Sequence, residues 1–227
     1  MGSQARKSFD KNIADIDLLV DMYEAAHELI EIQSESGEKL PAGYDVALRS
    51  ALVLLVTCWE AYIEDIVSEG VEHFANHLSS PHDLPQSLRK SLLRHLSQKG
   101  QDAYWDLSGD GWKTVLKSQL KELKGKRDFN FNSPVSSKTK DFIAEALGLE
   151  DITICWKFEN REPEANCELL DKFVKLRGQI AHRAKLPKKV EVDAVHGSIS
   201  FFKALVGKTG GRVNTHMKEI TGKSLWE

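Results

Sequence analysis

Cysteine and proline are scarce in this sequence, with three cysteines and six prolines among 227 residues. The cysteines, Cys58, Cys155 and Cys167, are far apart and form no C-x-x-C pair. This usage argues against a disulfide framework and fits a reducing compartment. We therefore expect a cytoplasmic protein.

Long hydrophobic runs and an excess of positive charge are also lacking. No uninterrupted apolar run reaches the roughly 18 residues of a membrane span. The first residues carry neither the apolar core of a signal peptide nor the serine or threonine of a myristoylation motif. We expect no membrane attachment. The formal net charge is −3, so any contact with nucleic acid must come from a local basic patch.

Several catalytic motifs are missing as well. The sequence has no G-x-x-x-x-G-K phosphate loop, no G-x-S-x-G elbow and no cysteine-histidine nucleophile pattern. His73 and His77 have a spacing that suits two metal ligands, but the glutamate of an H-E-x-x-H protease is missing between them. We predict an ordinary pair of helical histidines, no metal site and no cofactor.

Helical periodicity is abundant. Apolar residues at steps of three or four predict helices over residues 9–30, 48–78, 84–96, 112–123, 142–147, 169–181, 192–205 and 213–220. Ser136 or Ser137 is predicted to cap one of them, and Gly148 to close it. The predicted breaks include a connector from Gly125 to Ser137 and a flexible segment from Gly207 to Gly211. We predict an all-α helical bundle with inserted loops, formed by a single domain over residues 1–227.

The segment Leu176-Arg177-Gly178-Gln179-Ile180-Ala181-His182-Arg183 lies near the end of the 169–181 helix, shortly before Pro187. Histidine moves protons near neutral pH, and arginine stabilises the charge that builds up on phosphorus. Residues five apart on a helix are rotated by about 140° and separated by about 7.5 Å of rise. Arg177 and His182 therefore do not share one narrow face. A second copy of the helix across a two-fold axis would bring two of each around one cleft.

A basic cluster surrounds this pair, and Asp171 is the only acidic residue near it. Its members are Lys172, Lys175, Arg177, Arg183, Lys185, Lys188 and Lys189. The cluster can follow a phosphate backbone, and Lys175, Arg183 and Lys185 are candidate RNA contacts. Alternatively, basic residues stabilise the end of a helix through its dipole alone. Gly178 costs about 1 kcal/mol relative to alanine within a helix, which suggests close approach of another backbone or of a substrate.

A second candidate RNA surface lies in the middle of the chain. Aromatic residues there are interspersed with basic ones: Trp105, Trp112, Phe129, Phe131 and Trp156 with Lys121, Lys124, Lys126 and Arg127. Such residues can stack bases of single-stranded RNA, and Phe129, Phe131 and Arg127 are the best candidates. Core packing at loop ends explains the aromatics equally well.

The arginine-histidine segment, with its Ile-Ala-His ending, resembles the signature of the HEPN superfamily. The run Leu52-Val-Leu-Leu-Val-Thr-Cys-Trp-Glu-Ala-Tyr-Ile-Glu-Asp65 is similar to the long early helix of the RiboL-PSP-type branch. The best-matched core is residues 46–187, with 188–227 as a helical extension. The resemblance implies a homodimer with a composite site. It also implies a metal-independent endoribonuclease of a toxin or antiviral-defence system, in which Arg177 and His182 are catalytic and a cognate antitoxin or inhibitor is a possible partner.

One departure from the family pattern is Gly178, because the residue after the arginine is usually polar and often asparagine. This departure supports an alternative, a catalytically inactive HEPN module that dimerises or binds RNA. A third hypothesis is a helical interaction scaffold in which the motif is accidental. Glu60 and Glu64, one turn apart on the early helix, are candidates to orient Arg177 or His182, or are solvated charges.

Overall fold

The computed structural model describes residues 2–33, 45–130, 134–183 and 189–226. Over these ranges the elements are α1 (Gln4–Gln33), α2 (Val46–His77), η1 (Pro81–Asp83), α3 (Gln86–Ser97), η2 (Gln101–Leu107), α4 (Gly111–Asn130), α5 (Ser136–Leu147), η3 (Thr153–Cys155), α6 (Pro163–Arg183) and α7 (Val192–Thr221). These ranges contain no β-strand, only an isolated bridge between Phe158 and Arg161. The predicted all-α class is confirmed.

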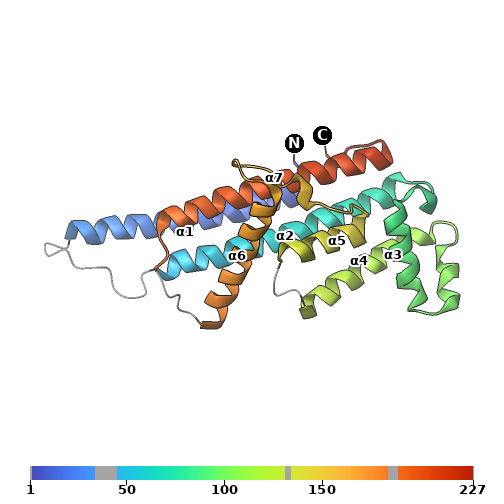
Figure 1. The fold of residues 1–227 in the computed structure, drawn as a ribbon, viewed down its shortest axis with the longest axis horizontal. Coiled ribbons are helices and arrows are strands. Elements are labelled where there is room, and N and C mark those ends of the chain that lie inside the picture. The colour runs from blue at the N-terminus through green and yellow to red at the C-terminus, as the bar shows by residue number, and fades with distance from the viewer. Residues whose placement is uncertain (1, 34–44, 131–133, 184–188, 227) are drawn as a thin grey trace.

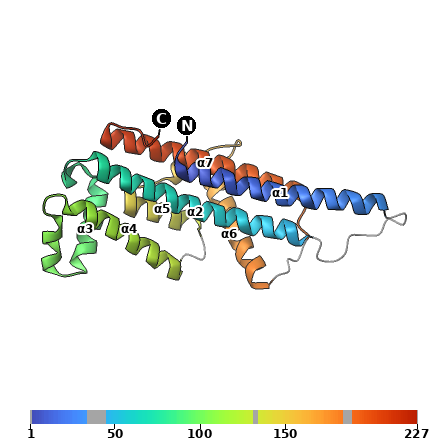
Figure 2. The ribbon, with the colours of Figure 1, turned by 180° about the vertical axis from the view of Figure 1, so that it is seen from behind.

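Three long helices, α1, α2 and α7, run side by side along the length of the molecule (Figures 1 and 2). The shorter helices α3, α4 and α5 gather at one end, and α6 crosses α2 near its middle. Helix α2 packs against α1, α4, α5, α6 and α7. It is therefore the central helix of the bundle, and its apolar residues are buried on more than one side.

Aromatic side chains of α2 form the centre of the core. Trp59 is fully buried, and its ring centroid lies 5.9 Å from that of Trp156 and 6.5 Å from that of Phe202. The buried polar atoms of these side chains have partners: the indole N–H of Trp156 donates to Oγ1 of Thr209 at 2.9 Å. This packing joins α2, α7 and the segment before α6 in one core.

Helix α2 also has the length and composition of a membrane span, although charged residues interrupt its apolar sequence. Its most apolar window of 18 residues contains at most two charged residues. More than half of its most apolar window, 56%, is buried inside the protein. This burial is the pattern of a core helix.

The prediction of a flexible segment at Gly207 to Gly211 is wrong, because α7 continues without a break to Thr221. A Cβ atom on Gly210 would lie 2.7 Å from the hydroxyl oxygen of Tyr62. That hydroxyl donates to the carbonyl of Val206 at 3.2 Å. Because glycine has no side chain, α7 can approach α2 closely at this position. Gly210 therefore serves helix packing and does not make the segment flexible.

The predicted connector and cap before α5 also need correction. Helix α4 passes through Gly125 and ends at Asn130, so the connector is shorter than predicted. The N-cap of α5 is Val135, which makes no side-chain capping bond. Ser136 instead hydrogen-bonds to Asp171 of α6 through its backbone N–H and its hydroxyl. Gly148 ends α5 in a left-handed conformation, as predicted.

Candidate active site

Helix α6 carries the arginine-histidine motif and is fixed to the core through its N-terminal half. Pro163 occupies the start of the helix, where a missing N–H costs nothing. The fully buried Asn166 donates from its side-chain amide to the carbonyl of Trp156 at 2.9 Å. Asp171 accepts hydrogen bonds from the N–H of Ser136 at 2.7 Å and from its hydroxyl at 3.1 Å. These contacts fix the orientation of the helix.

The C-terminal half of α6 projects beyond the bundle in both views of the ribbon (Figures 1 and 2). His182 is the residue before the last described residue of the helix, Arg183. The motif therefore lies at the end of the helix, as predicted.

Arg177 lies on the buried side of α6. It continues a line of residues at helical spacing, Asn166, Leu170 and Val174, which are all buried against the core. Arg177 is half-buried, and its Nε atom is shielded from solvent. The guanidinium is therefore held beside the bundle and is not a freely solvated charge.

His182 lies about 140° around the helix from Arg177 and is exposed. Lys175 is exposed too. A Cβ atom on Gly178 would meet nothing within 4 Å among the described residues, so no described part of its own chain explains this glycine. The chain thus presents His182 on an exposed face at the end of α6 and keeps Arg177 half-buried on another face of the same helix.

The other predicted site residues are placed less completely. Arg183 ends α6, but its side chain lies outside the described residues, as does all of Lys185. Arg127 belongs to α4, and its side chain also lies outside the described part. Glu60 is half-buried on α2, the helix that α6 crosses. Its role in orienting the pair stays a prediction.

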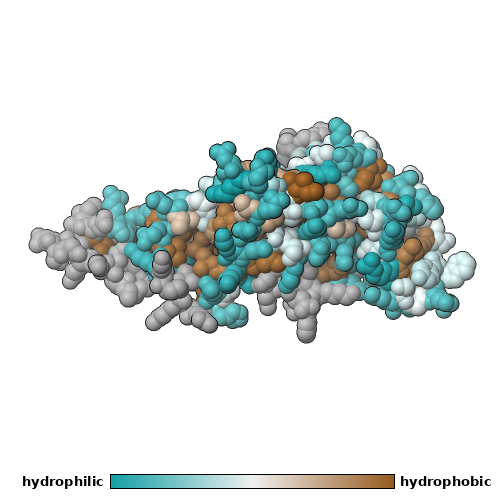
Figure 3. Space-filling model, viewed as in Figure 1, coloured by the Kyte–Doolittle hydropathy of each residue, from teal (hydrophilic) through white to brown (hydrophobic). Residues whose placement is uncertain are grey.

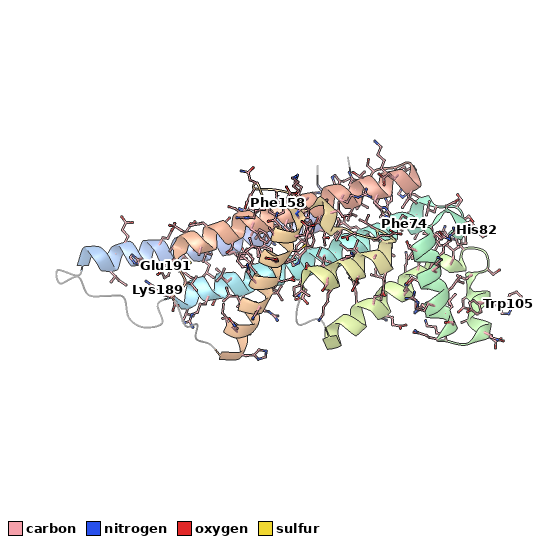
Figure 4. The ribbon with its side chains drawn as sticks, viewed as in Figure 1. Phe74, His82, Trp105, Phe158, Lys189 and Glu191 are labelled. Atoms are coloured by element: carbon pink, nitrogen blue, oxygen red, sulfur yellow. The ribbon has the colours of Figure 1, made fainter. Side chains whose placement is uncertain are left out.

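Two of the three described aromatic residues of the predicted RNA surface belong to the core. Trp112 and Trp156 are fully buried and cannot stack a base. Trp105 is 80% exposed, on η2 at the end of the molecule opposite the tip of α1 (Figure 4). The side chain of Phe129 and all of Phe131 lie outside the described residues.

Sequence reasoning missed an apolar groove of about 780 Å³ between α6 and α7. Leu52 of α2 and Phe201 of α7 line it, together with Leu169, Phe173 and Leu176 of α6. Brown hydrophobic surface is visible between teal side chains in the middle of the face drawn in Figure 3. Lys189 and Glu191, at the start of α7, are charged members of its lining (Figure 4). The apolar spacing of α6 is equally consistent with a helix face that is fully packed against the core. The groove exists because α6 diverges from α7, which the spacing does not indicate.

Thiol chemistry does not suit this protein. Burial raises the pKa of Cys58 and of Cys155 to about 11, and it raises the pKa of Cys167. Such thiols are protonated at neutral pH and are weak nucleophiles.

The histidine pair on α2 is structural in its contacts. Nε2 of His73 lies 2.9 Å from Oγ1 of Thr221, and Nδ1 of His77 lies 3.0 Å from the carbonyl oxygen of His73. Among the described residues, no group of three or more potential metal ligands occurs.

An all-α bundle that presents an arginine and a histidine five residues apart at the end of a projecting helix is the arrangement of a HEPN-type domain. The model of the RiboL-PSP-HEPN family matches residues 17–211. The chain belongs to this family, and the resemblance drawn from the sequence is confirmed. The match reaches into α1 and α7, beyond both ends of the 46–187 core. No curated protein and no solved structure matches the chain.

Proposed function

We propose that this protein is a metal-independent endoribonuclease whose site is composed by two copies of the chain. The observation that carries the proposal is the placement of His182 and Arg177 at the projecting end of α6 in a chain of the RiboL-PSP-HEPN family. We place it in the cytoplasm, in a toxin or antiviral-defence system in which a cognate inhibitor protein restrains it.

The reaction is the attack of a ribose 2′-hydroxyl on the adjacent phosphorus. His182 accepts the hydroxyl proton, and a proton passes to the departing 5′-oxygen from the same imidazole or from His182 of the partner subunit, because an imidazole can do both near neutral pH. Arg177 stabilises the charge on the non-bridging oxygens of the phosphorane. The products are a 2′,3′-cyclic phosphate and a 5′-hydroxyl. DNA lacks the nucleophile and is not a substrate.

A composite site follows from the helical geometry. The two side chains of one protomer leave α6 about 140° apart, so they approach one phosphate poorly. Two α6 helices packed across a two-fold axis place the histidine of one copy near the arginine of the other. The open surface at Gly178 leaves space for this approach.

The first test incubates the wild type, H182A and R177A with a cellular RNA pool in excess chelator. The wild type is expected to cleave RNA and leave 2′,3′-cyclic ends. Each variant should lower the rate by about 10² to 10⁴-fold, the usual contribution of a positioned acid or base. Lys90→Ala on α3 is a matched surface control and should cleave like the wild type. Intact RNA with the wild type across pH and protein concentration would reject the enzyme and favour the non-catalytic module.

The composite arrangement has its own test in mixed dimers. R177A and H182A are co-expressed with different tags and the doubly tagged dimer is purified. If each site takes its arginine from one copy and its histidine from the other, one of the two sites is complete. Cleavage should then return to about half of the wild-type rate per dimer. Mixed dimers as inactive as their parents would show that both residues act from one protomer.

A further inference from the structure

A stripe of exposed apolar residues runs along the outer face of α1. Leu18 is 58% exposed, Met22 63% and Leu29 59%, and Ala25 between them is also exposed. Their spacing of four, three and four residues is that of a coiled-coil seam. We name these four residues the α1 seam.

The α1 seam is separate from the face by which α1 joins the bundle. That face consists of Phe9, Ile13, Ile16, Val20 and Tyr23, all buried. Ile16 lies about 160° around the helix from Leu18, so the two stripes occupy opposite sides. The C-terminal end of α1 also extends past the neighbouring ends of α2 and α7 (Figures 1 and 2). Packing among the described residues therefore does not account for the seam.

The charges around the seam have one sign. Residues 15–30 contain five acidic residues and no lysine or arginine. Asp17 and Glu24, on the side of α7, are paired with Lys203 and His196 at 3.3 Å. The other three, Asp15, Asp21 and Glu28, are exposed. They border the seam where flanking residues of a coiled coil select a partner.

We propose that the α1 seam binds a basic amphipathic helix of a partner protein. The partner places apolar residues every three or four positions on the seam, and its lysines or arginines face Asp15, Asp21 and Glu28. A second copy of α1 fits poorly, because acidic residues would oppose acidic residues. RNA is repelled for the same reason. This surface is independent of Arg177 and His182, so it stands whether or not the chain cleaves RNA.

The test uses the full chain and a labelled synthetic peptide of about three heptads, with isoleucine and leucine at core positions and lysine at flanking positions. A second peptide keeps the core and carries glutamate in place of lysine. Fluorescence anisotropy is expected to show binding of the lysine peptide, weakened at high salt, and none of the glutamate peptide. Equal binding of both peptides, or of neither, overturns the proposal.

Variants locate the binding. M22S with L29S should raise the dissociation constant of the lysine peptide at least about tenfold, since two apolar contacts are lost. D21N with E28Q should raise it about threefold or more and reduce its salt dependence. Leu93→Ser on α3, another exposed leucine, and Asp65→Asn on α2 are the matched controls and should bind like the wild type. If the controls weaken binding as much as the seam variants do, the peptide binds elsewhere and the proposal is wrong.

Sedimentation of the same variants separates the partner helix from a second copy. We expect M22S with L29S to have the oligomeric state of the wild type, because the dimer of the proposed function forms through α6 and not through α1. Loss of a dimer in this variant alone would assign the seam to self-association and overturn the proposal.

Discussion

Histidines occupy two opposite environments in this molecule. In the bundle, His216 of α7 and His73 of α2 are buried. Nε2 of His216 lies 2.9 Å from the carbonyl oxygen of Leu147, the last residue of α5. At the end of α6, His182 is exposed on a helix that projects from the bundle.

The buried histidines are suited to a structural role, and the exposed histidine is suited to a chemical one. Burial lowers the pKa of His216 and of His73, so both are neutral at pH 7 and serve as hydrogen-bonding groups. His216 supplies the donor that a carbonyl at a helix end otherwise lacks. An exposed histidine at a helix C-terminus is free to meet a substrate and to exchange protons with it.

The largest effect that we expect is the loss of stability when a buried histidine is removed. His216→Ala removes the hydrogen bond to Leu147 and leaves a small cavity, at a cost of about 2–3 kcal/mol. The melting temperature should fall by roughly 5–10 °C. RNA cleavage at 25 °C should be unchanged.

His182→Ala is the matched control, and we expect its melting temperature within about 1 °C of the wild type. A stability loss in His182→Ala as large as that in His216→Ala would break the contrast, because the exposed histidine would then be structural.

The buried histidines should also make the stability of the protein depend on pH. A histidine whose pKa is lowered by folding stabilises the protein above its ordinary pKa of about 6.5, and this contribution is lost as pH falls through the lowered value. The free energy of unfolding should therefore decrease below about pH 6.5, by at most about 1.4 kcal/mol per pH unit for each such histidine. Chemical denaturation of the wild type and His216→Ala between pH 7 and pH 5 isolates the contribution of His216. Parallel curves would mean that His216 does not titrate on unfolding.

Much of the fold could be predicted from periodicity, because most helices here bury one apolar face. The start of α2, its end before Pro81 and the closure of α5 at Gly148 are each encoded within a few residues. Gly210 could not be interpreted this way. Its role depends on the hydroxyl of Tyr62, which is far away in sequence and reaches it only in the folded bundle.

The residue types of the candidate site could be predicted from the sequence. The exposure of each side chain could not. The spacing of Arg177 and His182 gave their angular separation, but only the packing of α6 on α2 decides that the arginine is half-buried and the histidine open. The aromatic residues show the same limit. Trp105 and Trp112 are alike in sequence context, yet one is exposed and the other fully buried, because α4 directs Trp112 into the core.

Gly178 gives the smallest expected effect and the finest test of the exposed helix end. Because a Cβ atom there meets nothing within the described part of its own chain, Gly178→Ala should stabilise the protein by about 0.5–1 kcal/mol through helix propensity alone. A bulky residue should behave differently if two α6 helices approach each other at this turn. Gly178→Leu is then expected to weaken dimerisation in sedimentation and to lower RNA cleavage, while Gly178→Ala preserves both more nearly. Gly211→Leu, at an exposed glycine of α7 that does not line the groove beside α6, serves as the size control. If Gly178→Leu dimerises and cleaves like the wild type, the turn at Gly178 is not in the interface, and the exposed histidine must meet its arginine by another route.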